Sequence, residues 1–302
     1  MESTQLGDTT RITLKRLCLY ALWVLVSLAI FWGTCRDLIR YSLGNDNASH
    51  ILLIPLITVW LLYVERKKIF AEIQNDYELA GILLALSIGI SILAVRSGAR
   101  WSVSGVLGAY TLALLCTWGA GFALLFGRSA VKNGGFPLLF LLMMVPLPDS
   151  LLNYVVYYLQ EGSADIAEMI FNLAGVPALR EGFVFHLAHL SIEVAQECSG
   201  IRSSMALLIL ALLVGHLFLR TLWKQALFVA IGLVIMIVKN GIRIATLTIL
   251  AQYVDSGFLY GRLHREGGIV FFLIGLVILF PVFWLLQRSE RPSGTLARTE
   301  VA

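Results

Sequence analysis

Long apolar runs alternate with short polar segments along almost the whole chain, a pattern typical of a protein that crosses a membrane several times. A transmembrane helix needs about 20 predominantly apolar residues. The runs that approach this length are residues 17–35, 48–64, 79–95, 103–126, 134–147, 203–219, 225–250 and 267–287. The fifth run is short and ends at Pro146 and Pro148, so it is the weakest candidate for a span. The pattern predicts an all-α polytopic membrane protein with about eight transmembrane helices.

One sizeable external segment, residues 148–198, separates the fifth and sixth runs. Apolar residues recur at near-helical spacing over residues 150–173, which predicts an amphipathic helix lying along the outer membrane surface. After a break at Gly175-Val176-Pro177, residues 182–195 alternate with a period of about two. This alternation predicts a short hairpin that leads toward the sixth run.

The composition supports a membrane protein and excludes an ordinary soluble domain. Hydrophobic residues make up 58% of the chain and charged residues only 14%, and the mean hydropathy is +0.82. A soluble chain of this length has too little interior to hide so much apolar surface. The net charge of +4 is spread between the runs and forms no patch, so we expect a lipid bilayer and no nucleic acid as partner. We expect one integral membrane domain over residues 1–302, with a disordered tail over about 288–302.

Lysine and arginine are distributed so as to predict the orientation of the chain. Short loops that face the cytoplasm carry an excess of these residues. With the N-terminus inside, the inner loops hold Arg11, Lys15, Arg16, Arg66, Lys67, Lys68, Arg128, Lys132, Arg220, Lys224, Arg288, Arg291 and Arg298. We therefore expect a multi-pass protein of the inner (plasma) membrane with both termini in the cytoplasm. The first run is too long for a signal-peptide core and lacks a small-residue cleavage site, so we expect a retained helix.

Cys198 differs from the other three cysteines in its polar surroundings. Cys18, Cys35 and Cys116 lie in or beside apolar runs and are expected to be packing residues. Cys198 precedes the sixth run, where the positive end of a helix dipole favours a thiolate. Its neighbours on the C-terminal side can support it: Ser199 as an N-cap, Gly200 by allowing close backbone approach, and Arg202 by its charge. Glu197 has the opposite effect, because an adjacent carboxylate disfavours the negatively charged thiolate. The sequence leaves open which of these influences on Cys198 is the stronger.

Two further polar positions stand out. The seventh run contains Lys239 and Arg243, and each basic residue in a span costs roughly 2.5–3.5 kcal/mol on insertion scales, so such residues usually face the protein interior. Asn240 and Arg243 are three residues apart and share a helix face. His264 lies in a polar loop before the eighth run and has a side chain suited to proton transfer near neutral pH.

No cofactor and no metal are expected. His186 and His189 together with Cys198 raise the question of a zinc site. Residues three apart in a strand point to opposite faces, which argues against shared ligation. The chain has no His-Glu-x-x-His motif and no Cys-x-x-Cys pair.

Taken together, these motifs resemble the exosortase/archaeosortase family of polytopic membrane cysteine transpeptidases. The resemblance is most specific over roughly 137–272. It is carried by Val145-Pro146-Leu147-Pro148, Glu197-Cys198-Ser199-Gly200-Ile201-Arg202-Ser203, Asn240-Gly241-Ile242-Arg243, and His264 followed by Gly267-Gly268 and Phe271-Phe272. The histidine at the third position is like that of exosortases, because archaeosortases have arginine there.

The resemblance implies an enzyme whose nucleophile is Cys198, with Arg243 and His264 as its catalytic partners at the outer face. It also implies substrates that are exported proteins ending in a PEP-CTERM-like tail: a short motif, a transmembrane helix and a basic cluster. The tail would be cleaved through an acyl-thioester on Cys198, and the protein transferred to an acceptor such as a lipid- or sugar-linked group. Which of Arg243 and His264 donates a proton and which stabilises the transition state stays open.

Two functions of other classes remain as alternatives. The first is a transporter or channel whose anion pathway is lined by Lys239, Asn240 and Arg243. The second is an acyl- or glycosyltransferase that uses an outer-face carboxylate such as Asp149, in which case loss of Cys198 would be harmless.

Overall fold

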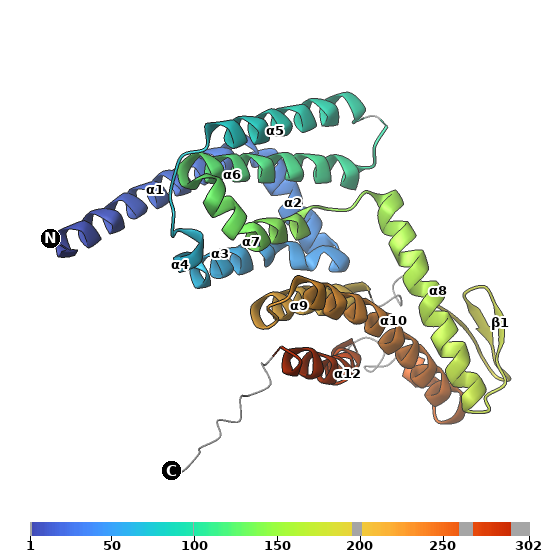
Figure 1. The fold of residues 1–302 in the computed structure, drawn as a ribbon. Coiled ribbons are helices and arrows are strands. Elements are labelled where there is room, and N and C mark those ends of the chain that lie inside the picture. The colour runs from blue at the N-terminus through green and yellow to red at the C-terminus, as the bar shows by residue number, and fades with distance from the viewer. Residues whose placement is uncertain (1, 99, 195–200, 260–267, 291–302) are drawn as a thin grey trace, which may run out of the picture. The chain divides into compact units, whose positions relative to one another are not determined.

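The computed structural model describes residues 2–98, 100–194, 201–259 and 268–290. The chain divides into two compact units, residues 1–152 and residues 153–302. Figure 1 shows the course of the helices in each unit.

The described residues of the first unit form helices joined by short loops. Its helices run in the order α1 (Glu2–Ile30), α2 (Trp32–Gly44), η1 (Asp46–Leu52), α3 (Ile54–Val64), α4 (Arg66–Ile69), α5 (Tyr77–Ser97), α6 (Val103–Asn133), α7 (Gly135–Phe140) and η2 (Leu141–Met144). The two long helices α5 and α6 lie side by side (Figure 1). The Ser87 hydroxyl of α5 donates to the Ala113 carbonyl of α6 at 2.8 Å, which fixes their register.

Aromatic side chains from three segments form the core of this unit. Tyr20, Phe70, Phe122 and Phe126 contact one another edge-on or tilted, with ring centroids 4.8–6.1 Å apart. Next to them α6 bends at Gly127, whose φ of +84° is readily adopted only by glycine. A side chain at this position would meet the Gln74 carbonyl oxygen at 2.3 Å, so glycine allows the loop before α5 to pack against the bend.

The second unit begins on α8 (Asp149–Leu173), whose first turn lies in the first unit. A three-stranded antiparallel sheet follows: β1 (Leu179–Glu181), β2 (Val184–His186) and β3 (Ser191–Glu193). Gly182, with φ of +62°, permits the tight turn between β1 and β2. Phe171 of α8 and Phe185 of β2 pack edge-on in a buried cluster that also includes residues of α10.

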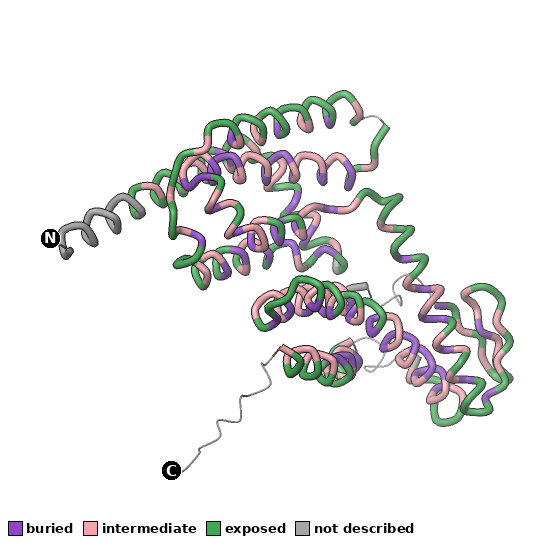
Figure 2. Tube along the Cα trace, in the orientation of Figure 1, coloured by how far each residue is buried: buried purple, intermediate pink, exposed green. Residues whose placement is uncertain are grey.

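Three apolar helices complete the second unit: α9 (Ile201–Phe218), α10 (Leu222–Tyr253) and α12 (Gly268–Arg288), with the short η4 (Ser256–Leu259) after α10. They share one buried cluster that contains Leu207 of α9, Phe228 of α10 and Leu279 of α12. Burial is confined to the facing sides of the helices, and the opposite sides expose large apolar residues (Figure 2). That distribution suits helices whose outer surface meets lipid.

The structure confirms an all-α polytopic membrane protein. Among the described residues, most of each apolar run identified in the sequence is helical. Among the described residues, five helices are long and apolar enough to cross a membrane, and seven spans result if each of two interrupted helix pairs counts as one. The five are Asn47–Val64, Tyr77–Ser97, Val103–Asn133, Leu222–Tyr253 and Gly268–Arg288, and Ser203–Phe218 is a shorter apolar helix.

Two of the expected spans are interrupted. The run 17–35 is not one straight helix, because Phe31 leaves the helical conformation and Trp32–Gly44 turns by 81° from Leu14–Ile30. The charged residues Arg36, Asp37 and Arg40 follow at once, and the bend keeps them from continuing into hydrocarbon. The run 134–147 consists of the short α7 and η2, which end before Pro146 and Pro148.

The secondary structure over residues 148–194 follows the sequence expectation with one addition. The expected helix is α8, and the expected hairpin is the β2–β3 pair. The pattern missed β1, because Leu-Arg-Glu does not alternate in hydrophobicity. The expected disordered tail lies outside the described residues from residue 291 onward.

Candidate active site

The structure describes only part of the expected site. Cys198, Ser199, Gly200 and His264 lie outside the described residues, and for Arg202 the backbone within α9 is described but the side chain is not. Asn240 and Arg243 are described, as are the segments on either side of Cys198 and His264. The site is therefore built from α10 outward.

The Asn240-Gly241 pair lies where α10 crosses α8. A side chain at Gly241 would meet the Cβ of Ile166 at 2.5 Å, and one at Gly162 would meet Ile237 at 2.8 Å. The two glycines therefore allow the helix backbones to approach closely, as small residues do at membrane helix interfaces. The glycine of the Asn-Gly-Ile-Arg motif thus has a packing role.

Asn240 bridges the same crossing. Its side chain is only 1% exposed, and its Nδ2 donates to the Ser163 hydroxyl of α8 at 3.1 Å. Ser163 in turn donates to the Leu159 carbonyl at 2.6 Å. A buried polar group without a partner costs free energy, so these bonds favour one register of α8 against α10.

Lys239 joins α10 to the start of α9. The side chain is 1% exposed, its ammonium group donates to the Ser203 hydroxyl, and its methylene stem packs at Gly275 of α12. Lys239 is therefore a structural link between three helices. This geometry agrees with the expectation that a basic residue within a span faces the protein interior.

Arg243 lies one turn beyond Lys239 on the same face of α10. It is partly exposed, whereas Lys239 and Asn240 are buried. The helix continues for ten residues beyond Arg243, to Tyr253, three residues further than the apolar run predicted. Arg243 is therefore less deeply buried than the two polar residues that precede it on α10.

A second polar contact fixes the chain just before Cys198. Gln160 of α8 is buried, and its Nε2 donates to the Val194 carbonyl at 2.7 Å. The Val194 amide donates to the Phe183 carbonyl at 2.8 Å, which continues the sheet. The chain is thus hydrogen-bonded on both sides of Cys198. Val194, before it, is bonded to α8, and Ser203, after it, is bonded to α10.

Arg180 holds the sheet against α8. Its guanidinium is 14% exposed and contacts Asp165 at 2.6 Å, Glu168 at 2.9 Å and Glu161 at 3.3 Å. Burial alone would lower the pKa of Arg180, but its hydrogen bonds to Asp165 and Glu168 raise that pKa overall. The arginine therefore stays charged and ties β1 to three carboxylates of one helix.

The directions of α9, α10 and α12 place the starts of α9 and α12 at the same end of the second unit. Lys224 near the start of α10 bonds Ser289 just after α12, while Lys239 bonds Ser203 near the start of α9. Thus α9 and α12 both run antiparallel to α10. The helices that follow Cys198 and His264 in the chain therefore begin at the end of the unit toward which Arg243 lies.

The described residues offer no metal site. No three His, Cys, Asp or Glu side chains among them are grouped so as to hold a metal ion. His186 instead pairs through Nδ1 with the Ser191 hydroxyl at 2.9 Å, across the β2–β3 pair. The question of ligation with Cys198 falls outside the described residues.

Sequence reasoning missed the supporting residues of α8. Gln160 and Ser163 are polar residues on the face of α8 that is otherwise buried and apolar. Two polar positions on the apolar stripe of an amphipathic helix are a readable signal of buried hydrogen bonds. Their partners, Val194 and Asn240, lie too far along the chain for the pattern to reveal.

Comparison with known proteins decides the family. The chain matches the family described as transmembrane exosortase (Exosortase_EpsH) over residues 17–281 of 302. The chain belongs to the transmembrane exosortase family. A search of curated proteins and a search of solved structures each gave no match.

Membership in the exosortase family has direct consequences for this chain. Exosortases are membrane-embedded transpeptidase-type enzymes that act on exported proteins. The match includes the Cys198, Arg243 and His264 positions and both units of the fold. The chain is thus a multi-pass membrane protein with a transpeptidase-type function.

Proposed function

We propose that this exosortase is a cysteine transpeptidase that cleaves the C-terminal sorting tail of exported proteins, with Cys198, Arg243 and His264 as one catalytic group. Ser199, Gly200, Arg202 and Asn240 support this group, and residues 1–302 act as one membrane domain. The family match over most of the chain carries the proposal.

The geometry of the second unit supports a shared site. The residues that bracket the Cys198 segment, Val194 and Ser203, are bonded to Gln160 of α8 and Lys239 of α10. The same two helices cross at Asn240, one turn before Arg243. An enzyme that joins groups from separate segments needs such fixed anchor points, because misplacement by about 1 Å can cost roughly 100-fold in rate.

The proposed reaction has two steps. The Cys198 thiolate attacks a backbone carbonyl near the recognition motif, the peptide C–N bond breaks, and the tail leaves as an amine that takes up a proton. An acceptor amine or hydroxyl then attacks the acyl-thioester, and the thiolate leaves. Arg243 cannot act as a base, since guanidinium stays protonated. It donates hydrogen bonds to the developing oxyanion or holds the thiolate, while His264 can pass a proton to the leaving amine.

The proposed setting follows from the charge distribution. Both termini and the basic loops lie in the cytoplasm, and the catalytic group lies at the outer face of the inner membrane. Substrates carry a PEP-CTERM-like motif, a transmembrane helix and a basic cluster. No cofactor takes part, and the acceptor is a lipid- or sugar-linked group.

The test is release of a substrate tail in membranes that contain single and double variants. We expect Cys198→Ser to abolish release while the protein still inserts, and Cys18, Cys35 and Cys116 changed together to Ala to leave it largely intact. Arg243→Lys should also fail, because an ammonium lacks the planar fork of a guanidinium. Loss of one oxyanion donor raises the activation barrier by about 3–4 kcal/mol, which gives an easily measured fall in the rate of tail release.

Non-additivity distinguishes one catalytic group from three separate effects. Adding Arg243→Ala or His264→Ala to Cys198→Ala should cost nothing more. Near-normal release in both Arg243→Lys and His264→Ala would contradict the grouping, and normal release in Cys198→Ser would contradict the nucleophile.

The geometry gives less support to an anion pathway. Lys239 and Asn240 are buried and donate hydrogen bonds to Ser203 and Ser163. Side chains committed in this way do not line an aqueous path in this structure. Anion flux into vesicles that contain the Cys198→Ser variant would favour the transport alternative.

A further inference from the structure

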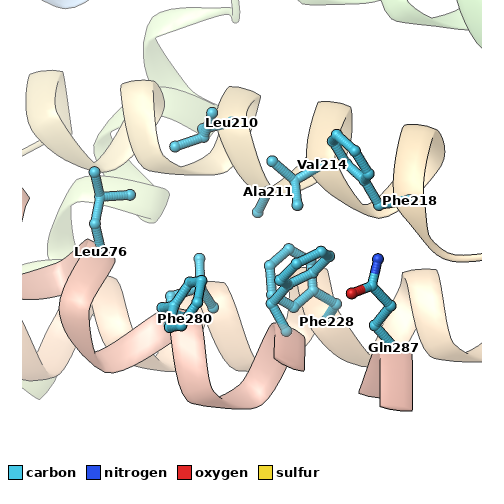
Figure 3. Close-up of a pocket in the computed structure, with 10 residues that line it drawn as sticks. Leu210, Ala211, Val214, Phe218, Phe228, Leu276, Phe280 and Gln287 are labelled. Atoms are coloured by element: carbon cyan, nitrogen blue, oxygen red, sulfur yellow. The ribbon is translucent and has the colours of Figure 1, made fainter. Parts of the chain in front are cut away.

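A cavity of about 410 Å³ lies between α9, α10 and α12, away from the proposed catalytic group. Figure 3 shows Leu210, Val214 and Phe218 of α9 facing Leu276 and Phe280 of α12 across it, with Phe228 of α10 behind. Gln287 lies at the Phe218 end. Nine of the ten lining residues are apolar, so the interior of the cavity suits a hydrocarbon.

The polar end of this cavity is positively charged. Here α9 ends, α10 begins and α12 ends, and we call this region the basic end. The segments 218–224 and 284–290 supply Arg220, Lys224 and Arg288 against the single carboxylate of Glu290, which leaves a charge of +2. Lys224 is held by Ser289 at 2.9 Å and lies 3.9 Å from Glu290, so the exposed Arg220 and Arg288 carry the excess.

Tryptophans mark the level of the membrane interface at the basic end. Trp223 and Trp284 are exposed, and the cations of Lys224 and Arg288 lie 5.6 and 5.1 Å from their ring centres. Tryptophan and basic side chains gather at the headgroup level of a bilayer. The cavity thus begins beneath the headgroups and extends into the hydrocarbon.

Its dimensions match one leaflet. Leu276 and Gln287 are eleven residues apart on α12, which corresponds to about 16 Å along the helix axis. Half of a hydrocarbon core about 30 Å thick is about 15 Å. The cavity therefore has the depth of a single acyl chain that descends from a headgroup at the basic end.

The charge of the basic end favours an anionic lipid over a transmembrane peptide. A peptide with a basic cluster would be repelled by Arg220 and Arg288. A single acyl chain is also much narrower than a helix with its side chains, which is about 10–12 Å wide.

We propose that this cavity is a binding site for an anionic phospholipid, with one acyl chain between α9 and α12 and its phosphate at Arg220 and Arg288. The acyl chain would lie in the apolar cavity beside the edge-on contact of Phe218 with Phe283, whose ring centres are 5.9 Å apart. Arginine suits the headgroup because its planar fork binds phosphate oxygens in pairs. The bound lipid would stabilise the helices that carry the catalytic segments at their other end.

Native mass spectrometry of the full-length protein in detergent tests the proposal, with phosphatidylglycerol and phosphatidylcholine of identical acyl chains as probes. We expect a retained phosphatidylglycerol adduct with an affinity at least tenfold above that of phosphatidylcholine. Each arginine near an anionic headgroup contributes about fivefold. The double variant Arg220→Gln with Arg288→Gln should therefore lower phosphatidylglycerol affinity about 25-fold.

Matched variants separate the cavity from the general lipid surface. Val214→Phe fills the cavity and should reduce retention of both lipids, while Val277→Phe, on an exposed side of α12, should not. Changing Lys67 and Lys68 together to Gln, in the other unit, is the charge control. Equal affinity for the two lipids, or a preference that survives loss of both arginines, would overturn the proposal. So would unchanged retention in Val214→Phe.

Discussion

At the scale of single residues, the absence of a side chain at Gly241 matters as much as any polar group near it. A Cβ there would lie 2.5 Å from Ile166 and 3.0 Å from the Ser163 carbonyl oxygen. We predict that Gly241→Ala lowers stability by about 1–3 kcal/mol, because α8 and α10 must separate to admit the methyl group. Tail release should fall further than the lost stability explains, since the crossing also holds Asn240. Thermal unfolding in detergent and release in membranes measure the two effects.

The control for this change is Gly89→Ala. Gly89 lies in α5, and a Cβ there meets no other atom within 4 Å. Its replacement should leave both stability and release unchanged or slightly raise the stability. If Gly241→Ala is as harmless as Gly89→Ala, the close crossing is not needed for function.

Gln160 gives the second prediction at this scale. Gln160→Leu keeps the volume of the side chain but leaves the buried Val194 carbonyl without its donor, at a cost of about 1–3 kcal/mol. We expect a loss of tail release because the chain leading to Cys198 is less firmly held. Gln225→Leu is the matched control, since its Nε2 bonds the Leu219 carbonyl at 2.8 Å at the basic end. Equal release by the two variants at equal stability would remove Gln160 from the support of the site.

The sequence predicted the positions of these residues better than their partners. The sequence placed Asn240 and Arg243 three residues apart on a helix, and both lie on α10. It did not show that the Asn240 side chain bonds Ser163, which is 77 residues away along the chain. Side-chain partners at such separations depend on how helices cross, and periodicity within one helix carries no information about crossings.

At the scale of elements, the small sheet depends on one arginine. Arg180 contacts Glu161, Asp165 and Glu168 while largely shielded from water. We predict that Arg180→Gln loosens the sheet from α8 at a cost on the order of 1–3 kcal/mol, between the values for exposed and buried ion pairs. Hydrogen exchange of residues 179–193 should become faster while that of α5 and α6 stays the same.

Arg36→Gln serves as the control for the sheet. Its pair with Asp37 has both side chains about half exposed, so its loss should cost little or nothing. Unchanged exchange in the sheet of Arg180→Gln would show that the apolar contact of Phe171 with Phe185 is sufficient to hold it.

Most of the helices could be predicted, because membrane helices are recognised in a sequence by the length and hydrophobicity of their apolar runs. The helix over 150–173 was expected almost to the residue, since its apolar stripe is continuous. The bend at Phe31 and the kink at Gly127 were not, because each depends on what the chain packs against. Hydrophobicity averaged over about 20 residues shows where a span lies and misses a break within it.

At the scale of the whole molecule, the class of protein followed from composition, and the resemblance to the family followed from four motifs in a fixed order. The number of spans did not follow, because an interrupted helix pair and a straight helix have similar hydropathy. The orientation of each unit in the membrane is inferred from the distribution of lysine and arginine alone. That orientation decides whether the proposed site can meet exported proteins.

The last prediction tests this orientation in both units at once. Single cysteines are introduced at exposed positions in a variant in which Cys18, Cys35 and Cys116 are Ala and Cys198 is Ser. The positions are Val103→Cys and Lys67→Cys in the first unit, and Leu173→Cys and Leu222→Cys in the second.

A membrane-impermeant maleimide should label residues 103 and 173 in intact cells, and residues 67 and 222 only after permeabilisation. The reason is that Lys67 lies in the short helix α4, which has three basic residues, and Leu222 lies between Arg220 and Lys224. Basic segments of this kind between spans are retained in the cytoplasm. Labelling of residue 222 from outside would place the basic end at the outer face and the start of α9 at the inner face. A nucleophile just before α9 would then have no access to exported substrates, and the proposed function would fail on topology alone.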